Sequence, residues 1–421
     1  MKVFKFGGAS VKDANAVKNV GEVIKLYQDD LIVVISAMGK TSNGLEKVVD
    51  SYLNKDGKPQ EYLKLVKDFH FNILTDLFDN KDHPIFNEIH NTFVEIEWEI
   101  EEEPSREYDY IYDQIVSVGE LLSTKIVSSY LNEIGIINTW QDVRNIIQTD
   151  NTHRKAKIEW ELTEKLILET VTPQLNTENQ SIIITQGFIG SSSELFTTTL
   201  GREGSDFTAG ILAHCTDAES VTIWKDVPGM LNADPKWFND TIKLNNISYH
   251  EAVELAYYGA SVIHPKTIKP LHNKKIPLHI KSFISPKKEG TLINGNSKDD
   301  SLIPSFIFKM NQLLISISAK DYSFIMEDNL SHIFGLFSKH RVTINLMQNS
   351  AISFSVCVDF DDQKIRQLIE ELKSEYKVLY NEGLELVTIR HYDQKTIERV
   401  TMDKEVLVEQ KSRQTARFVL K

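Results

Sequence analysis

Four short apolar runs, each followed by a loop of glycine and other small residues, constrain the fold of this chain most strongly. They cover residues 3–6, 31–36, 182–185 and 221–224. An uninterrupted apolar run is typical of a strand that is buried on both faces, as in a parallel sheet. Helical patterns lie between the runs, among them a long one over residues 109–134, which indicates βαβ units. We therefore predict an α/β fold in which helices sandwich a mainly parallel sheet.

The loops after these runs fall at the carboxyl ends of the predicted strands. Ligands of open α/β sheets bind beyond this edge, and glycine lets backbone N–H groups approach an anion closely. A P-loop is excluded, because Val34 stands where the GxxxxGK[ST] spacing before Lys40 requires its first glycine. The four loops together still predict an anion site, with glycines at Gly7, Gly8, Gly39, Gly187 and Gly229.

Residues 199–210 (TLGREGSDFTAG) place Arg202, Ser205 and Asp206 in a glycine-rich turn that opens a helix. A guanidinium group can grip a carboxylate or phosphate through two hydrogen bonds. Asp206 can orient an ammonium group, a lysine or Mg²⁺. From these residues alone, an ordinary helix start remains an alternative, with Ser205 as N-cap and Asp206 on the helix dipole.

Composition narrows the class of protein. Lys plus Arg number 47 and Asp plus Glu 60, so the net charge is −13, which argues against a nucleic-acid binder. Cys215 and Cys357 are far apart, which excludes a disulfide framework and a cysteine-rich zinc site. No apolar run approaches the ~20 residues that span a bilayer. We expect a cytoplasmic protein that binds neither nucleic acid nor membrane.

The pattern changes along the chain, which predicts separate domains. Residues 1–293 form the main α/β domain, with a helical insertion or lid at 51–105, whose acidic run at 99–103 is expected to be a solvated face. A polar, turn-rich linker covers 294–304. Residues 305–421 are predicted to be α+β. Separate strands are expected at 378–380 and 384–389. The order βαββαβ is that of a complete ferredoxin-like unit, and a shortened second unit follows, without helices and with a terminal hairpin.

Six segments together resemble the aspartate kinases of the amino acid kinase superfamily. They occur in the family's order and are KFGGASV at 5–11, VISAMG at 34–39, VGELLS at 118–123, and residues 199–209, 223–235 and 259–265. Residues 305–421 resemble the ACT regulatory region of these kinases. The resemblance implies an amino acid kinase fold followed by an ACT region.

The resemblance also implies the reaction. ATP, with Mg²⁺, would phosphorylate the side-chain carboxylate of L-aspartate to give 4-phospho-L-aspartate, the first step towards lysine, threonine and methionine. That carboxylate has a pKa of about 3.9 and is ionised at pH 7, so no general base is needed. An amino-acid effector such as lysine or threonine, and a homodimer or higher homo-oligomer through the ACT region, are further implications. Another carboxylate kinase of the superfamily and a non-catalytic ACT sensor are the alternatives.

Roles for individual residues follow from the same resemblance. Lys5 and Asp206 match the residues that contact the transferred phosphoryl group and organise the transfer site. Glu120 matches the position that binds the α-amino group. An edge-strand lysine and a surface helix residue are the alternatives for Lys5 and Glu120. The predicted substrate-binding residues are Ser42, Glu120, Arg202 and Ser205.

The nucleotide and effector sites are assigned in the same way, and no residue is predicted to ligate a metal. Many family members have Thr at Lys225, Lys at Ser261 and Gly at Glu203. We hypothesise that Lys225 supplies the charge that Ser261 lacks. The predicted ATP-binding residues are Lys5, Gly7, Gly8, Ser10, Lys225, Asp226, Leu231, Lys236 and Ser261. The predicted effector residues are Met326, Asn345, Gln348 and Asn349.

Overall fold

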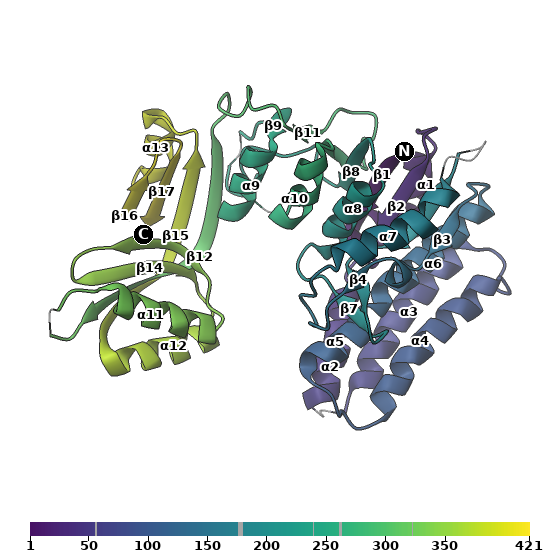
Figure 1. Cartoon of the computed structure of the whole chain (residues 1–421), viewed down its shortest axis with the longest axis horizontal. Helices are drawn as coiled ribbons and strands as arrows, with labels where there is room; N and C mark the ends of the chain where they lie inside the picture. The colour runs from purple at the N-terminus through teal and green to yellow at the C-terminus, as the bar shows by residue number, and fades with distance from the viewer. Residues whose placement is uncertain (55–56, 176–179, 239, 261–262, 322) are drawn as a thin grey trace. The chain divides into compact units, whose positions relative to one another are not determined.

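The computed structural model describes residues 1–54, 57–175, 180–238, 240–260, 263–321 and 323–421 (Figure 1). The chain forms two compact units, neither of which is continuous in sequence. The first comprises Met1–Met230, Lys243–Val253 and Val262–Ser297, and the second Leu231–Ile242, Glu254–Ser261 and Lys298–Lys421. Among the described helices, none is both long enough and apolar enough to cross a membrane.

An eight-stranded sheet forms the centre of the first unit, in the order β3-β5-β2-β1-β8-β10-β11-β9. Neighbouring strands from β3 to β10 pair in parallel, and β11 runs antiparallel to β10. The four strands expected from the sequence, β5, β2, β1 and β8, lie side by side at its centre, which confirms the prediction. The strands are β1 (Lys2–Phe6), β2 (Leu31–Ile35), β3 (Thr139–Gln141), β5 (Ile182–Gln186), β8 (Ser220–Lys225), β9 (Asn246–Ser248), β10 (Leu278–Ser282) and β11 (Thr291–Asn294). A smaller sheet contains β4 (Gln148–Thr149), β6 (Ile189–Ser192) and β7 (Thr197–Thr199).

Helices cover both faces of the large sheet. On one face, Phe4 and Phe6 of β1 share a single apolar core with helices α1 to α6. On the other, α8 contacts β1, β2 and β8, and α7 and α10 pack against α8. Because side chains alternate along a strand, Lys5 points to the α8 face. The helices are α1 (Ala14–Ile24), α2 (Thr41–Asn54), α3 (Pro59–Leu77), α4 (Pro84–Glu101), α5 (Tyr108–Val116), α6 (Val118–Glu133), α7 (Trp160–Thr170), α8 (Gly204–Cys215), α9 (Tyr249–Tyr258) and α10 (Pro265–Lys274).

Two helical predictions need comment. The helix expected over 109–134 is interrupted at Ser117, so that Glu120 falls in the first turn of a new helix, α6. The predicted insertion at 51–105 contains α3, α4 and the end of α2. Val66 and Phe93 of these helices are buried in the same core as the sheet. A lid function for this segment stays a prediction.

The second unit contains a six-stranded antiparallel sheet in the order β13-β14-β12-β15-β17-β16. Helices α11 and α12 close one apolar core over it. The predicted order βαββαβ, from β12 to β15, and the terminal hairpin of β16 and β17 are confirmed. The elements are β12 (Ser305–Ala319), α11 (Glu327–Lys339), β13 (Ile344–Asn349), β14 (Ser353–Asp359), α12 (Asp362–Glu375), β15 (Tyr376–Arg390), α13 (Gln394–Thr401), β16 (Val406–Lys411) and β17 (Thr415–Leu420).

The end of this unit differs from the prediction in two ways. Two short strands were expected around Asn381–Glu382–Gly383, but β15 runs through them as one strand. The turn residues are absorbed as a register shift against β12, with Gly383 at φ 69°. The shortened ferredoxin-like unit at the end of the chain was also expected to lack helices, yet α13 is present. The sequence pattern of α13 is weak because only Ile397 and Val400 are buried. The helix begins after Asp393, whose side chain accepts a hydrogen bond from the Thr396 N–H.

Candidate active site

Lys5 and Asp206 form an ion pair at the carboxyl end of the central strand β1. Lys5 Nζ lies 2.6 Å from Asp206 Oδ1, and the two residues are only 9% and 2% exposed. Since β1 lies between β2 and β8, Lys5 is not a solvated residue of an edge strand. A buried charge pair of this kind needs further polar partners, and a ligand with ionic groups can supply them.

The loop before α8 brings the predicted Arg202 and Ser205 to the same strand ends. Asp206 lies in the first turn of α8, and its neighbour Ser205 is buried. A Cβ atom at Gly187, just after β5, would lie 2.4 Å from Ser205 Cβ, so only glycine allows the two segments this close. Arg202 precedes the helix and is exposed to solvent. Its guanidinium group is therefore available to a ligand.

The loops after β1 and β2 form one cradle beside this ion pair. The Gly39 N–H donates to Gly8 O at 3.0 Å. A Cβ atom at Gly8 would lie 2.8 Å from Ala37 O, and one at Gly7 would lie 3.5 Å from Lys5 Nζ. Ser10 is buried, and its Oγ has no hydrogen-bond partner among the described residues. The cradle thus presents backbone and an unpaired hydroxyl beside a lysine, as an anion site requires.

Glu120 is buried, which excludes the alternative of a surface helix residue. The Ala37 N–H donates to its Oε1 at 3.4 Å, and its Oε2 has no partner in the described part of the chain. Burial raises the pKa of Glu120 to about 8, against the opposing effect of Lys5. A carboxylate with this environment is poised to accept an ammonium group. Ser42, the other predicted contact, is half-buried in the first turn of α2.

Glu203 belongs to the site, although its sequence position suggested only a departure from a common glycine. It precedes α8 with φ 54°, in the left-handed region that favours glycine. Its Oε2 is buried without a partner among the described residues. Burial and the charge of Asp206 raise its pKa, while Lys225, Arg202 and Lys5 act in the opposite direction. The unusual residue at a left-handed position was the signal that could have identified it.

The predicted nucleotide residues are only partly brought together. Lys225 Nζ lies 3.8 Å from Asp206 Oδ2. Asp226 lines a cavity of about 620 Å³ at the ends of β8 and β10, together with Lys243, Ser282 and Lys288, which sequence reasoning missed. Leu231 and Lys236 belong to the second unit, where Lys236 is exposed. Ser261 lies outside the described residues, so the idea that Lys225 compensates for it stays a hypothesis.

The predicted effector residues fall into two groups. Met326, Gln348 and Asn349 are exposed, Met326 just before α11 and the others at the end of β13. Asn345 is buried, and its amide oxygen and amide N–H groups are all hydrogen-bonded. Its Oδ1 accepts from Lys309 Nζ at 2.8 Å, and its Nδ2 donates to Gln312 and Asp359. Both N–H groups of the Asn345 amide are therefore occupied, and its Oδ1 already accepts one hydrogen bond.

A Mg²⁺ site in this protein would have to use few side-chain ligands. Within the described residues, no group of three or more His, Cys, Asp or Glu side chains could hold a metal ion. Mg²⁺ in kinases needs only one or two carboxylates, since phosphate oxygens and water complete its shell. The carboxylates of Asp206 and Glu203 beside the cradle fit this limited demand.

This chain is similar to known proteins over most of its length. The family model described as "Amino acid kinase family" matches residues 1–282. Lysine-sensitive aspartokinase 3 of Escherichia coli is 30% identical over 92% of this chain and 86% of its own length. Aspartokinase 1, chloroplastic, of Arabidopsis thaliana is 30% identical over 88% of this chain, which spans 65% of the plant protein.

Solved structures agree with the sequence relatives. E. coli aspartokinase III in complex with lysine and aspartate superimposes with a TM-score of 0.84 at 28% identity, covering 100% of this chain and 95% of that one. The same enzyme in complex with aspartate and ADP gives a TM-score of 0.83. The agreement covers the α/β sheet and the antiparallel sheet alike, as the predicted fold class requires. This chain belongs to the amino acid kinase family and, within it, to the aspartate kinases.

Proposed function

We propose that this kinase transfers the γ-phosphoryl group of ATP to the side-chain carboxylate of L-aspartate at the end of strand β1. The observation that carries this proposal is the buried ion pair of Lys5 and Asp206 beside the Gly7–Gly8 cradle. Both substrates are anionic, so the barrier depends on positioning and on neutralising charge. Lys5 is the buried cation on the strand end where the two would meet.

The reaction needs no proton transfer by the protein. A carboxylate oxygen of aspartate attacks the γ-phosphorus, and the bond from that phosphorus to the bridging oxygen of ADP breaks. Negative charge develops on the transferred group and on ADP. We assign Lys5 to the transferred group, with Asp206 fixing the position of the Lys5 ammonium at 2.6 Å.

Aspartate would be held at both ends. Glu120 would bind the α-amino group, because its buried Oε2 lacks a partner among the described residues. Arg202, exposed at the entrance to α8, would pair with a carboxylate, and Ser42 and Ser205 would supply hydroxyl groups. Glutamate, acetylglutamate and UMP as acceptors, and a sensor without activity, are not favoured by membership of the aspartate kinases.

ATP would lie along the glycine cradle and the end of β8. Gly7, Gly8 and Ser10 would face its phosphates, and Lys225 and Asp226 would continue the site towards the cavity beside β10. Leu231, Lys236 and Ser261 stay predicted nucleotide contacts. Asp206 and Glu203 would be the carboxylates that hold Mg²⁺, which would supply positive charge to neutralise the phosphates.

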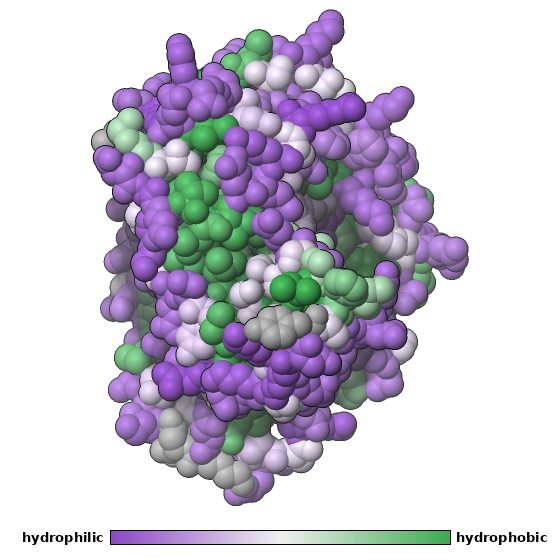
Figure 2. Space-filling model, turned by 90° about the vertical axis from the view of Figure 1, so that its left-hand side faces the viewer, coloured by the Kyte–Doolittle hydropathy of each residue, from purple (hydrophilic) through white to green (hydrophobic). Residues whose placement is uncertain are grey.

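The second unit is proposed to bind an amino-acid effector and to join subunits. E. coli aspartokinase 3 is lysine-sensitive, and E. coli aspartokinase III has been solved in complex with lysine and aspartate. Here Met326, Gln348 and Asn349 are exposed and can contact such a ligand. Large apolar side chains of this unit also remain exposed, and Figure 2 shows hydrophobic areas within its mostly hydrophilic surface. The exposed apolar side chains of this unit include Phe324, Met347, Leu379 and Met402. Such a surface suits a homodimer or higher homo-oligomer.

Trapping the acyl phosphate with hydroxylamine tests the proposed function directly. Purified enzyme with MgATP and L-aspartate should form aspartyl hydroxamate, and chelation of Mg²⁺ should abolish it. Glutamate, acetylglutamate and UMP should give no comparable turnover. Added lysine, threonine or methionine would identify the effector. ATP binding without hydroxamate formation would overturn the proposal in favour of a sensor.

A further inference from the structure

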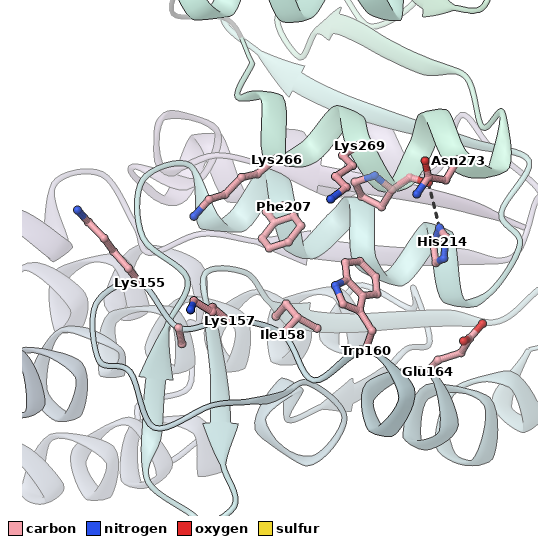
Figure 3. Close-up of a pocket in the computed structure, with 12 residues that line it drawn as sticks. Lys155, Lys157, Ile158, Trp160, Glu164, Phe207, His214, Lys266, Lys269 and Asn273 are labelled. Atoms are coloured by element: carbon pink, nitrogen blue, oxygen red, sulfur yellow. Dashed lines mark hydrogen bonds between the residues drawn. The ribbon is translucent and has the colours of Figure 1, made fainter. Parts of the chain in front are cut away.

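A groove of about 670 Å³ runs along helix α8 between α7, α10 and the segment 155–158. None of its lining residues belongs to the predicted aspartate or ATP sites. Asp206 faces the sheet and pairs with Lys5, whereas the next residue, Phe207, lines this groove (Figure 3). Helices α8 and α10 can approach closely because a Cβ atom at Gly210 would lie 3.1 Å from Thr267 O. The groove is therefore a second concavity, separate in its residues from the transfer site.

Aromatic rings form the floor of the groove. Trp160 meets Phe207 and His214 edge-to-face, with ring centroids 6.4 and 5.4 Å apart. His214 is fixed by a hydrogen bond of 3.0 Å between its Nδ1 and Pro270 O. Trp160 nevertheless keeps 39% of its surface exposed. A large ring left open beside fixed neighbours offers a stacking surface to a planar ligand.

Lysines line one end of this aromatic floor, and one carboxylate, Glu164, lies at the other end beside Trp160. Lys266 and Lys269 stand three residues apart on one face of α10, and Lys157 lies on the opposite wall. Figure 3 shows the ammonium groups of Lys266 and Lys269 extending beside the Phe207 ring. In the described part of the chain, none of the three has a carboxylate partner at ion-pair distance. In a chain of net charge −13, such unpaired positive charge in one concave place marks complementarity to an anion.

We propose that this groove binds a small anion that carries a planar aromatic ring. Its ring would stack on Trp160 and Phe207, and its phosphate or carboxylate would pair with Lys266 and Lys269. The volume of about 670 Å³ suits a molecule of the size of a nucleoside monophosphate. A nucleotide and an aromatic acid share this chemistry, and the test separates them.

The site can be tested in the full-length enzyme with the probe 1-naphthyl phosphate. Its binding is measured by the quenching of Trp160 fluorescence and by calorimetry. The probe should bind at least tenfold more tightly than inorganic phosphate or naphthalenemethanol, because ring and anion act together. The double variant Lys266→Gln/Lys269→Gln should weaken binding about tenfold, and Trp160→Leu should remove the quenching. Competition by AMP or by phenylpyruvate would identify the nucleotide or the aromatic acid as the preferred source.

Lys165→Gln is the matched control, because Lys165 lies on α7 outside the groove and pairs with Glu169. It should leave probe binding unchanged, and hydroxamate formation by every variant confirms that the protein is folded. Equal affinity of the double variant and the unchanged enzyme would overturn the proposal. The proposal would also be overturned if inorganic phosphate or naphthalenemethanol bound as tightly as 1-naphthyl phosphate. The groove would then recognise only one half of the ligand.

Discussion

The transfer site at β1 and the polar cluster around Asn345 both bury polar side chains, but they differ in how many hydrogen bonds remain unmade. Ser10, Glu120 and Glu203 each keep a buried oxygen without a partner among the described residues. In Asn345, by contrast, the amide oxygen bonds to Lys309 and the amide N–H groups bond to Gln312 and Asp359. A buried polar atom without a partner costs stability. The first pattern therefore indicates a binding site, and the second a structural cluster.

The largest expected effect concerns Lys5 at the transfer site. Lys5→Met should lower kcat about 10³-fold, because it removes the cation placed for the transferred group. Lys2→Met is the matched control on the same strand, where Lys2 instead pairs with Asp29. It should keep kcat nearly unchanged in the hydroxamate assay. If Lys5→Met kept more than a tenth of kcat, the assignment of Lys5 to the transferred group would be wrong.

Substitution of Glu120 tests whether this buried carboxyl group lowers the unfolding free energy of the protein. Its pKa is raised from 4.5 to about 8 in the folded protein. The folded state therefore binds the proton more tightly than the unfolded state, and stability is lost as pH rises from about 4.5 to about 8. Glu120→Gln removes this pH dependence. The unfolding free energy of the variant minus that of the unchanged enzyme should therefore increase by on the order of 2 kcal/mol between pH 6 and pH 9.

Urea unfolding at both pH values measures this gain, and steady-state kinetics should show the KM for aspartate raised roughly 100-fold, as for loss of a buried charge pair. Glu133→Gln, at the exposed end of the same helix, should change neither quantity. A Glu120→Gln protein that is less stable at pH 9 than the unchanged enzyme would contradict the raised pKa.

Substitution of Asn345 tests whether a buried, hydrogen-bonded amide stabilises the fold. Asn345→Ala should lower the unfolding free energy by about 1–3 kcal/mol, because Lys309, Gln312 and Asp359 lose a shared partner. Asn349→Ala, at the exposed end of the same strand, should leave stability unchanged and alter only the response to the effector. Unfolding and inhibition curves of both variants check this. An Asn345 variant of full stability with lost inhibition would show that this amide serves the ligand.

The smallest expected effect sharpens the role of Lys225. Its ammonium lies 3.8 Å from Asp206 Oδ2, at the edge of the transfer site. Lys225→Ala should raise the KM for ATP several-fold, because one positive charge beside the phosphates is lost. Lys225→Arg keeps the charge and should restore most of the affinity. An unchanged KM for ATP in the alanine variant would refute the hypothesis that Lys225 replaces a lysine at position 261.

Local patterns were sufficient for most of the fold. The apolar runs predicted the four central strands, and the order βαββαβ followed from periodicity. The short helix α13 was missed because two buried residues give too little signal in eight positions. The strand break expected in β15 was wrong because sheet pairing on β12 outweighed the turn preference of Asn381–Glu382–Gly383.

The sequence alone determined the family, the parallel sheet and the glycine loops at its edge, because each depends on residues that are close along the chain. Only the tertiary structure decided which polar atoms are already paired. Asn345 and Lys309 are 36 positions apart, and Lys5 and Asp206 meet across most of the first unit. Hydrogen bonds act over about 3 Å in space, so whether a polar group is free for a ligand depends on packing between distant segments.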